Sequence, residues 1–148
     1  GFTLIELLIV ISIIAIMSAI GLTSYITFVK NARDAKRQSD LKFIQSALEQ
    51  YFADQKYYPM QLTPGDPLIM GSKVYMTKIP SDPNNTVNNY RYESRVLSCQ
   101  SSPLCDNVTS NKCGCYCLFV KMENQQGNKI EGNCSLPSQN YNFSLTKP

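Results

Sequence analysis

The sequence of 148 residues predicts an α+β protein, in which one long N-terminal helix packs part of its length against a small antiparallel β-sheet. Three observations predict this fold. Residues 1–29 form one apolar run, residues 41–52 carry an apolar stripe at helical spacing, and all six cysteines follow residue 98. We therefore expect a helix with a protruding apolar half and a packed amphipathic half, followed by a disulfide-stapled C-terminal region.

The apolar run of residues 1–29 contains about one bilayer thickness of helix, and Glu6 carries its only charged side chain. Because the run is apolar on every side, it fits a membrane span or a fully buried helix. A cleaved secretory signal fits less well, since its apolar region is only about 7–15 residues long and follows a basic stretch. Any basic leader ahead of Gly1 is therefore expected to have been removed.

The helix is predicted to continue without a break from about Phe2 to about Asp54, since no proline occurs before Pro59. Gly21 is its weak point, because glycine costs about 1 kcal/mol in a helix interior, and we expect local unwinding there. Pro59 is a stop signal for the helix, and the two tyrosines before it, Tyr57 and Tyr58, are expected to cover the helix end.

The second half of the helix carries its apolar residues on one face, which predicts that the rest of the chain packs against it. These residues lie three and four positions apart: Leu41, Ile44, Leu48, Tyr51 and Phe52. We expect Ala32 and Ala35 to extend the stripe toward the N-terminus. The charged residues of this stretch are expected to lie largely off the stripe: Asp34, Lys36, Arg37, Asp40 and Lys42.

The net charge of +3 is concentrated in residues 30–42, which we name the basic collar. This segment holds five basic and two acidic residues (5 − 2 = +3), and the rest of the chain holds nine of each sign. We expect a solvated helix face that touches lipid headgroups or acidic residues of a neighbour. A nucleic-acid site is less favoured, because the collar is short and mixed in sign.

Residues 60–148 are rich in proline, asparagine and serine, and they contain short β-like runs. The segment 115–132 resembles a hairpin closed near residues 126–128. An antiparallel sheet packed on the helix stripe is the simplest way to bury the apolar residues of the stripe and of the β-like runs. The predicted strands cover residues 73–79, 88–97, 115–123, 127–132 and 139–146.

The six cysteines indicate disulfides and an oxidising location; they are Cys99, Cys105, Cys113, Cys115, Cys117 and Cys134. The Cys113-Gly-Cys115-Tyr-Cys117 run would place three sulfurs on one face of a strand. A bond within a C-x-C pair closes a strained ring, so each of the three is expected to pair with a cysteine outside the run. That reduces the 15 pairings of six cysteines to six, which remain open. A thiolate zinc site is the less favoured alternative.

The residue types exclude some chemistry and leave one weak metal candidate. The chain has no histidine, which excludes a histidine base or ligand, and we expect neither an enzyme nor a bound cofactor. Asp82 opens the oxygen-rich stretch 82–89, which is a weak calcium candidate. It lacks the spacing and glycine of an EF-hand loop, so a plain turn is favoured.

The opening run Gly1-Phe2-Thr3-Leu4-Ile5-Glu6-Leu7 resembles the cleavage and methylation motif of type IV pilins and type II secretion pseudopilins. The resemblance is strong over residues 1–30, reasonable over 31–59 and architectural beyond. It implies that Gly1 precedes the cut made by prepilin peptidase and that Phe2 becomes an N-methylated N-terminus. The stretch 82–89 also corresponds loosely in position to the calcium loop of secretion pseudopilins.

Two positions depart from the family pattern. The chain still begins with Gly1, and if this residue is retained, the free amine sits one residue further out and its contact with Glu6 changes. Thr23 stands where many pilins have a proline that loosens the helix in the filament, and Gly21 is expected to serve instead.

Two roles are considered for Glu6, of which the intermolecular one is favoured because of the resemblance, and both are compatible at different stages. The resemblance implies that it sets the axial register of neighbouring subunits by meeting an amine, and one buried acid per copy selects one stagger on physical grounds. The local alternative is a capping box, because Thr3-x-x-Glu6 has the required spacing.

The resemblance implies the major structural subunit of a type IV pilus, which polymerises with copies of itself for adhesion, motility or DNA uptake. Residues 1–29 would anchor a single-span precursor in the lipid of the cytoplasmic membrane and then form the core of a cell-surface filament. Residues 30–59 would form the amphipathic half and turn, and residues 60–148 the head. Prepilin peptidase and the assembly machinery would be partners, and no specific nucleic-acid site is expected.

Two other functions remain open. The alternative is a major pseudopilin of a type II secretion system, which the stretch 78–83 followed by Tyr90-Arg-Tyr favours, whereas the cysteine-rich end favours a pilin. The third hypothesis is a monomeric single-span receptor or adhesin, which leaves the opening motif and Glu6 unexplained.

Overall fold

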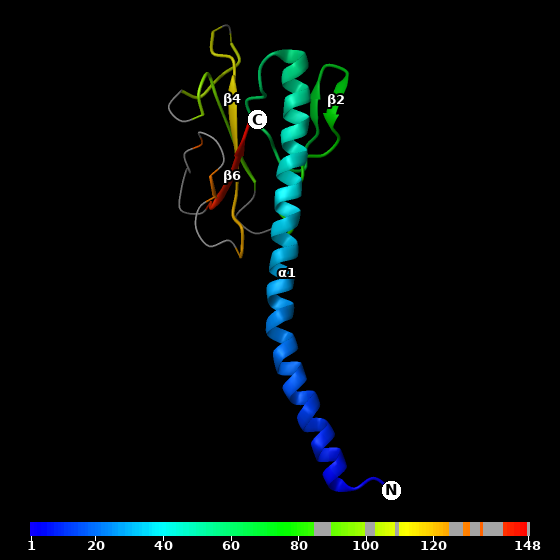
Figure 1. The fold of residues 1–148 in the computed structure, drawn as a ribbon. Coiled ribbons are helices and arrows are strands. Elements are labelled where there is room, and N and C mark those ends of the chain that lie inside the picture. The colour runs from blue at the N-terminus through cyan, green and yellow to red at the C-terminus, as the bar shows by residue number, and fades with distance from the viewer. Residues whose placement is uncertain are drawn as a thin grey trace.

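A computed structural model describes residues 1–84, 90–99, 103–108, 110–124, 129–130, 134 and 141–147. One long helix runs the length of the molecule, and the β-strands gather around its C-terminal half to form a head (Figure 1). The N-terminal half stands alone and curves gently away from the head. The predicted α+β class, with one long helix and small sheets, is therefore confirmed.

The helix α1 spans Leu4–Gln55 in one piece of 52 residues, which confirms the predicted continuous helix. Thr3 is its N-cap, and Lys56 ends it in the left-handed region at φ 64°, where its N–H donates to the Phe52 carbonyl at 2.8 Å. The local unwinding expected at Gly21 is not seen, because the helix passes through this residue without interruption. Tyr58 stacks on Phe52 at 4.6 Å between ring centroids, so it covers the helix end as predicted.

Two sheets lie to either side of α1 in Figure 1. The smaller sheet is an antiparallel pair formed by β1 (Leu68–Met70) and β2 (Lys73–Met76). The larger has the strand order β3-β4-β6-β5, in which β4 pairs antiparallel with β3 and β6, and β5 pairs parallel with β6. Its strands are β3 (Arg91–Arg95), β4 (Cys115–Val120), β5 (Lys129–Ile130) and β6 (Phe143–Thr146).

The pairing differs from the sequence-based prediction in two ways. The hairpin predicted over residues 115–132 is wrong, because β6 lies between β4 and β5. The strand β4 is apolar on both faces and needs long neighbours, which β3 and β6 supply, whereas β5 offers only two residues. The short strand β1 was not predicted, because three residues carry too little alternation to be recognised.

The main core lies between the α1 stripe and the inner face of the larger sheet. Leu41, Ile44, Leu48 and Tyr51 are buried as predicted. They share one cluster with alternate residues of β4 and β6, which are Tyr116, Leu118, Val120, Phe143 and Leu145. This cluster attaches the head to the C-terminal half of α1.

The predicted N-terminal extension of the stripe is wrong, because Ala32 and Ala35 are exposed and the charged side chains take the buried face. Asp34, Arg37 and Asp40 are 8%, 3% and 4% exposed. The reason is helical phase. Arg37 lies four residues and Asp34 seven residues before Leu41, which returns both to the same face, whereas Ala35 lies six residues before it.

The outer face of β4 is buried beneath disulfides. The bonds pair Cys99 with Cys115, Cys105 with Cys113, and Cys117 with Cys134, which is one of the six expected patterns. The single-face prediction is wrong for Cys113. It precedes β4 and joins the helix-facing core, while Cys115 and Cys117 lie in the outer cluster with Phe119.

Gly114 permits this change of face at the start of β4. Its N–H donates to the carbonyl oxygens of both Arg95 and Val96, at 3.0 and 2.9 Å. A Cβ atom at this position would collide with the Val96 carbonyl oxygen. The close approach of two backbone segments therefore requires glycine here.

We predict that Gly114→Ala lowers the stability of the head by about 1–3 kcal/mol, because the added methyl group has no space beside Val96. Thermal unfolding of the full chain in detergent, followed by circular dichroism, measures this. Gly21→Ala is the matched control, since nothing lies within 4 Å of the methyl group it would add. Equal unfolding midpoints for both variants and the parent chain would contradict the packing argument.

Candidate functional site: an apolar stem and the clamp that holds the head

The N-terminal half of α1 presents an unburied apolar surface, and we name residues 2–29 the stem. An 18-residue window of α1 with a mean hydropathy of 2.6 is entirely unburied. By length and composition this helix could cross a membrane. Such a surface requires lipid or other apolar helices around it. Its largest exposed side chains include Phe2, Leu4, Ile5, Ile14, Met17, Ile20, Tyr25 and Phe28.

Glu6 closes a capping box at the tip of the stem. Its Oε2 accepts from the Thr3 backbone N–H at 2.8 Å and from the Thr3 hydroxyl at 2.7 Å. The Thr3 hydroxyl oxygen accepts in turn from the Glu6 N–H at 3.4 Å. The capping box, which was the less favoured of the two roles considered for Glu6, is thus present. Glu6 also lines an open hollow of about 350 Å³ with Gly1 and Phe2, so an external group can reach the carboxylate.

Two hydroxyl groups of the stem are satisfied within the helix. Ser12 donates to the Leu8 carbonyl oxygen at 2.7 Å, and Ser24 donates to that of Ile20 at 3.4 Å. These bonds remove the cost of placing a hydroxyl group in apolar surroundings. Glu6 is consequently the one group of the stem whose formal charge still needs a partner when water is excluded.

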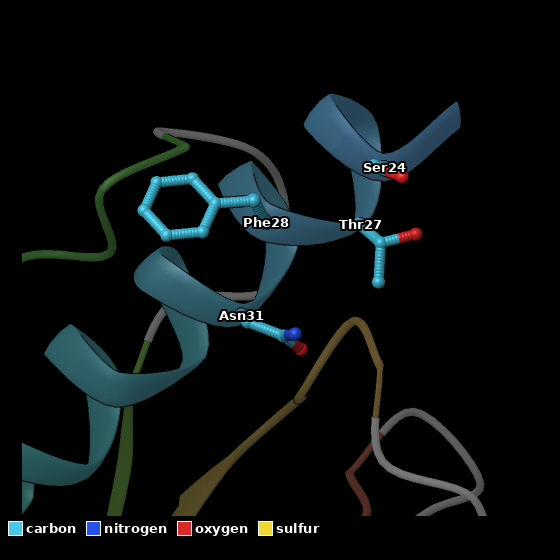
Figure 2. Close-up of a pocket in the computed structure, with 4 residues that line it drawn as sticks. All are labelled: Ser24, Thr27, Phe28 and Asn31. Atoms are coloured by element: carbon cyan, nitrogen blue, oxygen red, sulfur yellow. The ribbon is translucent and has the colours of Figure 1, made fainter. Parts of the chain in front are cut away.

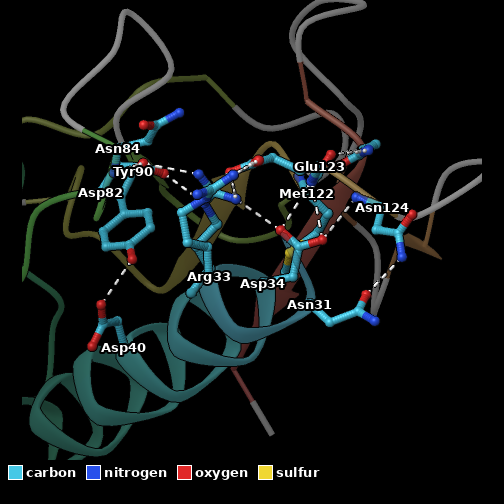
Figure 3. Close-up of polar contacts among 12 residues, drawn as sticks. Asn31, Arg33, Asp34, Asp40, Asp82, Asn84, Tyr90, Met122, Glu123 and Asn124 are labelled. Atoms are coloured by element: carbon cyan, nitrogen blue, oxygen red, sulfur yellow. Dashed lines mark hydrogen bonds and ion pairs between the residues drawn. The ribbon is translucent and has the colours of Figure 1, made fainter. Parts of the chain in front are cut away.

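A network of charged residues, which we name the polar clamp, joins α1 to the head just beyond the stem (Figure 3). Its centre is Arg37, whose side chain is 3% exposed. The Arg37 guanidinium donates to both carboxylate oxygens of Asp82, at 2.7 and 3.0 Å. It also contacts Asp34 at 2.7 Å and Glu123 at 2.8 Å. The clamp consists of Arg33, Asp34, Arg37, Asp82 and Glu123.

The clamp fixes the end of β4 against the helix. The Asp34 carboxylate accepts from the backbone N–H groups of Glu123 and Asn124, each at 2.9 Å. Arg33 donates two hydrogen bonds to the Glu123 carboxylate, one from Nε to Oε1 at 2.7 Å and one from Nη2 to Oε2. Charge-assisted bonds of this bidentate kind are directional, so they define the position of the strand end.

Two carboxylates of α1 beyond the clamp bind tyrosines of the head. Asp40 accepts a hydrogen bond from the Tyr90 hydroxyl at 2.8 Å. The pKa of Tyr90 is raised, chiefly because the phenol is buried and secondly because it donates to this carboxylate. Glu49 accepts from the hydroxyls of Tyr58 and Tyr116, at 3.1 and 3.0 Å. Each phenol donates a proton that it keeps at neutral pH, so all three bonds persist under physiological conditions.

The clamp changes how the basic collar is interpreted. Lys36 and Lys42 are exposed, as expected for a solvated face, but Arg37 points into the head of its own chain. Asp82, the weak calcium candidate, has both oxygens engaged by Arg37. Most of its loop, residues 85–89, lies outside the described part of the chain. Sequence reasoning missed this pairing because Arg37 and Asp82 are 45 residues apart, although the helical phase of Arg37 pointed inward.

We predict that Arg37→Met destabilises the protein by about 3–5 kcal/mol, because it leaves buried carboxylates without their cation. Denaturant titration of the full chain in detergent measures the loss. Lys42→Met removes an exposed cation one turn further along and should change stability by less than about 0.5 kcal/mol. Equal losses from the two variants would mean that the clamp does not hold the head.

The clamp also predicts an acid-sensitive head. The bond from Arg33, followed by those from Arg37, lowers the pKa of Glu123 from 4.5 to about 2. The stabilisation from a lowered carboxylate pKa is complete above the unfolded value and is lost as pH falls toward the folded value. Stability should therefore decline between about pH 4.5 and pH 2, and Glu123→Gln should flatten this decline. Unfolding midpoints measured across this window test it, and parallel curves for both proteins would refute it.

Comparisons with known proteins match part of the chain. Residues 1–22 match the family model described as the prokaryotic N-terminal methylation motif. Over 58 residues the chain is 36% identical to the type IV major pilin protein PilA of Myxococcus xanthus (strain DK1622). This match covers 39% of the chain and 26% of that relative, so the chain spans about a quarter of its length. No solved structure gives a significant match.

Proposed function

We propose that this chain, whose N-terminal segment is that of the type IV pilin family, is the major structural subunit of a type IV pilus. The two matches confirm the resemblance predicted from residues 1–7. One structural observation supports the rest: the stem is apolar and exposed, with a single carboxylate at its tip. Such a stem is stable when it is surrounded by lipid in a membrane, and equally when it is packed among the stems of other copies of the chain.

The proposal gives each part of the chain a role. Residues 1–29 anchor the precursor in the cytoplasmic membrane and later form the filament core, residues 30–59 form the amphipathic half and turn, and residues 60–148 form the head on the filament surface. Prepilin peptidase cuts after Gly1 and Phe2 is then N-methylated. Gly21 has the lowest intrinsic helix propensity of any residue in the stem. It is the point where the helix unwinds during assembly.

In the filament, Glu6 sets the register between copies. Hydrophobic stems pack against one another at many axial offsets with similar free energy. One acid per copy, which needs one amine per copy in a dry core, favours the single offset that brings them together. The capping box occupies the carboxylate in the separate chain, so assembly exchanges the Thr3 contacts of Glu6 for the amine of a neighbour.

The assembled filament would lie at the cell surface and serve adhesion, motility or DNA uptake, as the resemblance implies. Its role is structural rather than enzymatic. The alternative is a major pseudopilin of a type II secretion system, which the stretch 78–83 favours. This stretch is fixed in the head, since the Ile79 N–H and carbonyl bond to Asp66 and Gly65 at 2.8 Å. Electron microscopy of cells separates the two, because only a pilus gives long surface fibres containing this chain.

We predict that Glu6→Ala and Glu6→Gln insert into the membrane normally but strongly reduce filament yield, because both remove the charge that needs an amine. Thr3→Ala is the matched control, since it removes the hydroxyl of the local cap and keeps the carboxylate. Quantification of sheared surface filaments, with membrane fractions as the reference, measures both steps. Normal yield from the two Glu6 variants, or an equal defect in Thr3→Ala, would count against the register role.

A further inference from the structure

An open groove lies on α1 where the stem meets the head. It has a volume of about 440 Å³ and is lined by Ser24, Thr27, Phe28 and Asn31. Figure 2 shows the four side chains on successive turns of the helix. The Asn31 Oδ1 atom accepts from the side-chain amide of Asn124, at 2.6 Å, so the turn that follows β4 borders the groove from the head side.

The length of the stem places this groove at a particular depth in a bilayer. A hydrocarbon core of about 30 Å is crossed by about 20 helical residues at 1.5 Å each. Counted from Leu4, where α1 begins, about 20 residues end at Thr23. The next eight residues cover about 12 Å, which brings Ser24–Asn31 into the headgroup layer beneath the head.

The chemistry of the groove fits that layer. Phe28 and the nearby Tyr25 are 69% and 66% exposed, and aromatic side chains concentrate at membrane interfaces. Hydroxyl and amide groups line the rest of the groove, none of its four lining residues is a carboxylate, and Lys30 adjoins it in the sequence. A phosphodiester accepts hydrogen bonds from amide and ammonium groups, which Asn31 and Lys30 carry, and a basic residue at this level favours it further.

We infer that the groove seats the phosphodiester headgroup of a phospholipid from the leaflet beneath the head, and that this contact fixes how deeply the stem inserts. The inference rests on the proposed membrane-anchored precursor. A second copy of the chain is the competing occupant. The headgroup is favoured because the groove is continuous with a stem whose length places it in that layer before any other copy arrives.

A single tryptophan reports the depth of the groove, because the natural sequence contains none. Phe28→Trp in the full chain is reconstituted into vesicles of phosphatidylcholine or phosphatidylglycerol. Each vesicle carries either a headgroup spin label or brominated acyl chains as the quencher. Ile14→Trp and Phe43→Trp are matched controls, since Ile14 lies mid-stem and Phe43 is exposed on α1 beside the head.

We expect the headgroup label to quench Phe28→Trp strongly in both lipids, which share the phosphodiester. Brominated chains should quench Ile14→Trp, and neither quencher should affect Phe43→Trp. Quenching of Ile14→Trp without headgroup quenching of Phe28→Trp would overturn the groove inference alone. Failure of brominated chains to quench Ile14→Trp would overturn the membrane-anchored precursor as well.

A second variant separates a seated headgroup from mere depth. Ser24→Val with Asn31→Leu, in the Phe28→Trp background, removes polar groups of the groove and should lower headgroup quenching by about twofold or more. Ser46→Val, at an exposed serine of α1 beside the head, should leave it unchanged. No change in the groove variant would overturn the inference. Headgroup quenching that disappears as the protein-to-lipid ratio rises would assign the groove to a second copy instead.

Discussion

The burial of one guanidinium determines how this molecule is built. Arg37 occupies a face of α1 that its helical phase directs into the head, and a buried cation there requires carboxylates from several directions. Asp34 comes from the helix, Asp82 from the segment before β3, and Glu123 from the turn after β4. Three distant parts of the chain are therefore fixed at one point, immediately above the place where the helix leaves the head.

The two halves of α1 differ in their surroundings although they form one continuous helix. In the C-terminal half, apolar and charged residues share the buried face, so the head is held both by packing around Leu41 and Leu48 and by the polar clamp. In the N-terminal half, no residue that the structure describes covers the apolar window. The clamp stands at the boundary, where its directional bonds prevent the head from shifting along the helix.

The sequence predicts those features that depend on local periodicity. The length of α1 follows from the absence of proline, the stripe at Leu41 and Leu48 follows from spacing, and the outward pairing of Cys115 and Cys117 follows from ring strain. Features that depend on contacts between distant residues were missed. Alternation does not reveal that β6 separates β4 from β5, and a charged residue is assumed to face water until its partners are known.

The self-capped carboxylate at the tip has a consequence for reversibility. Because Thr3 already donates two hydrogen bonds to Glu6, the carboxylate of a separate chain keeps hydrogen-bond partners, while its formal charge stays unpaired. Under the proposed function, assembly would replace these two hydrogen bonds by the amine of a neighbour, so the free-energy difference between the assembled and the separate chain is smaller than for a carboxylate with no partner at all. A small difference of this kind would suit a subunit that returns from the filament to the bilayer.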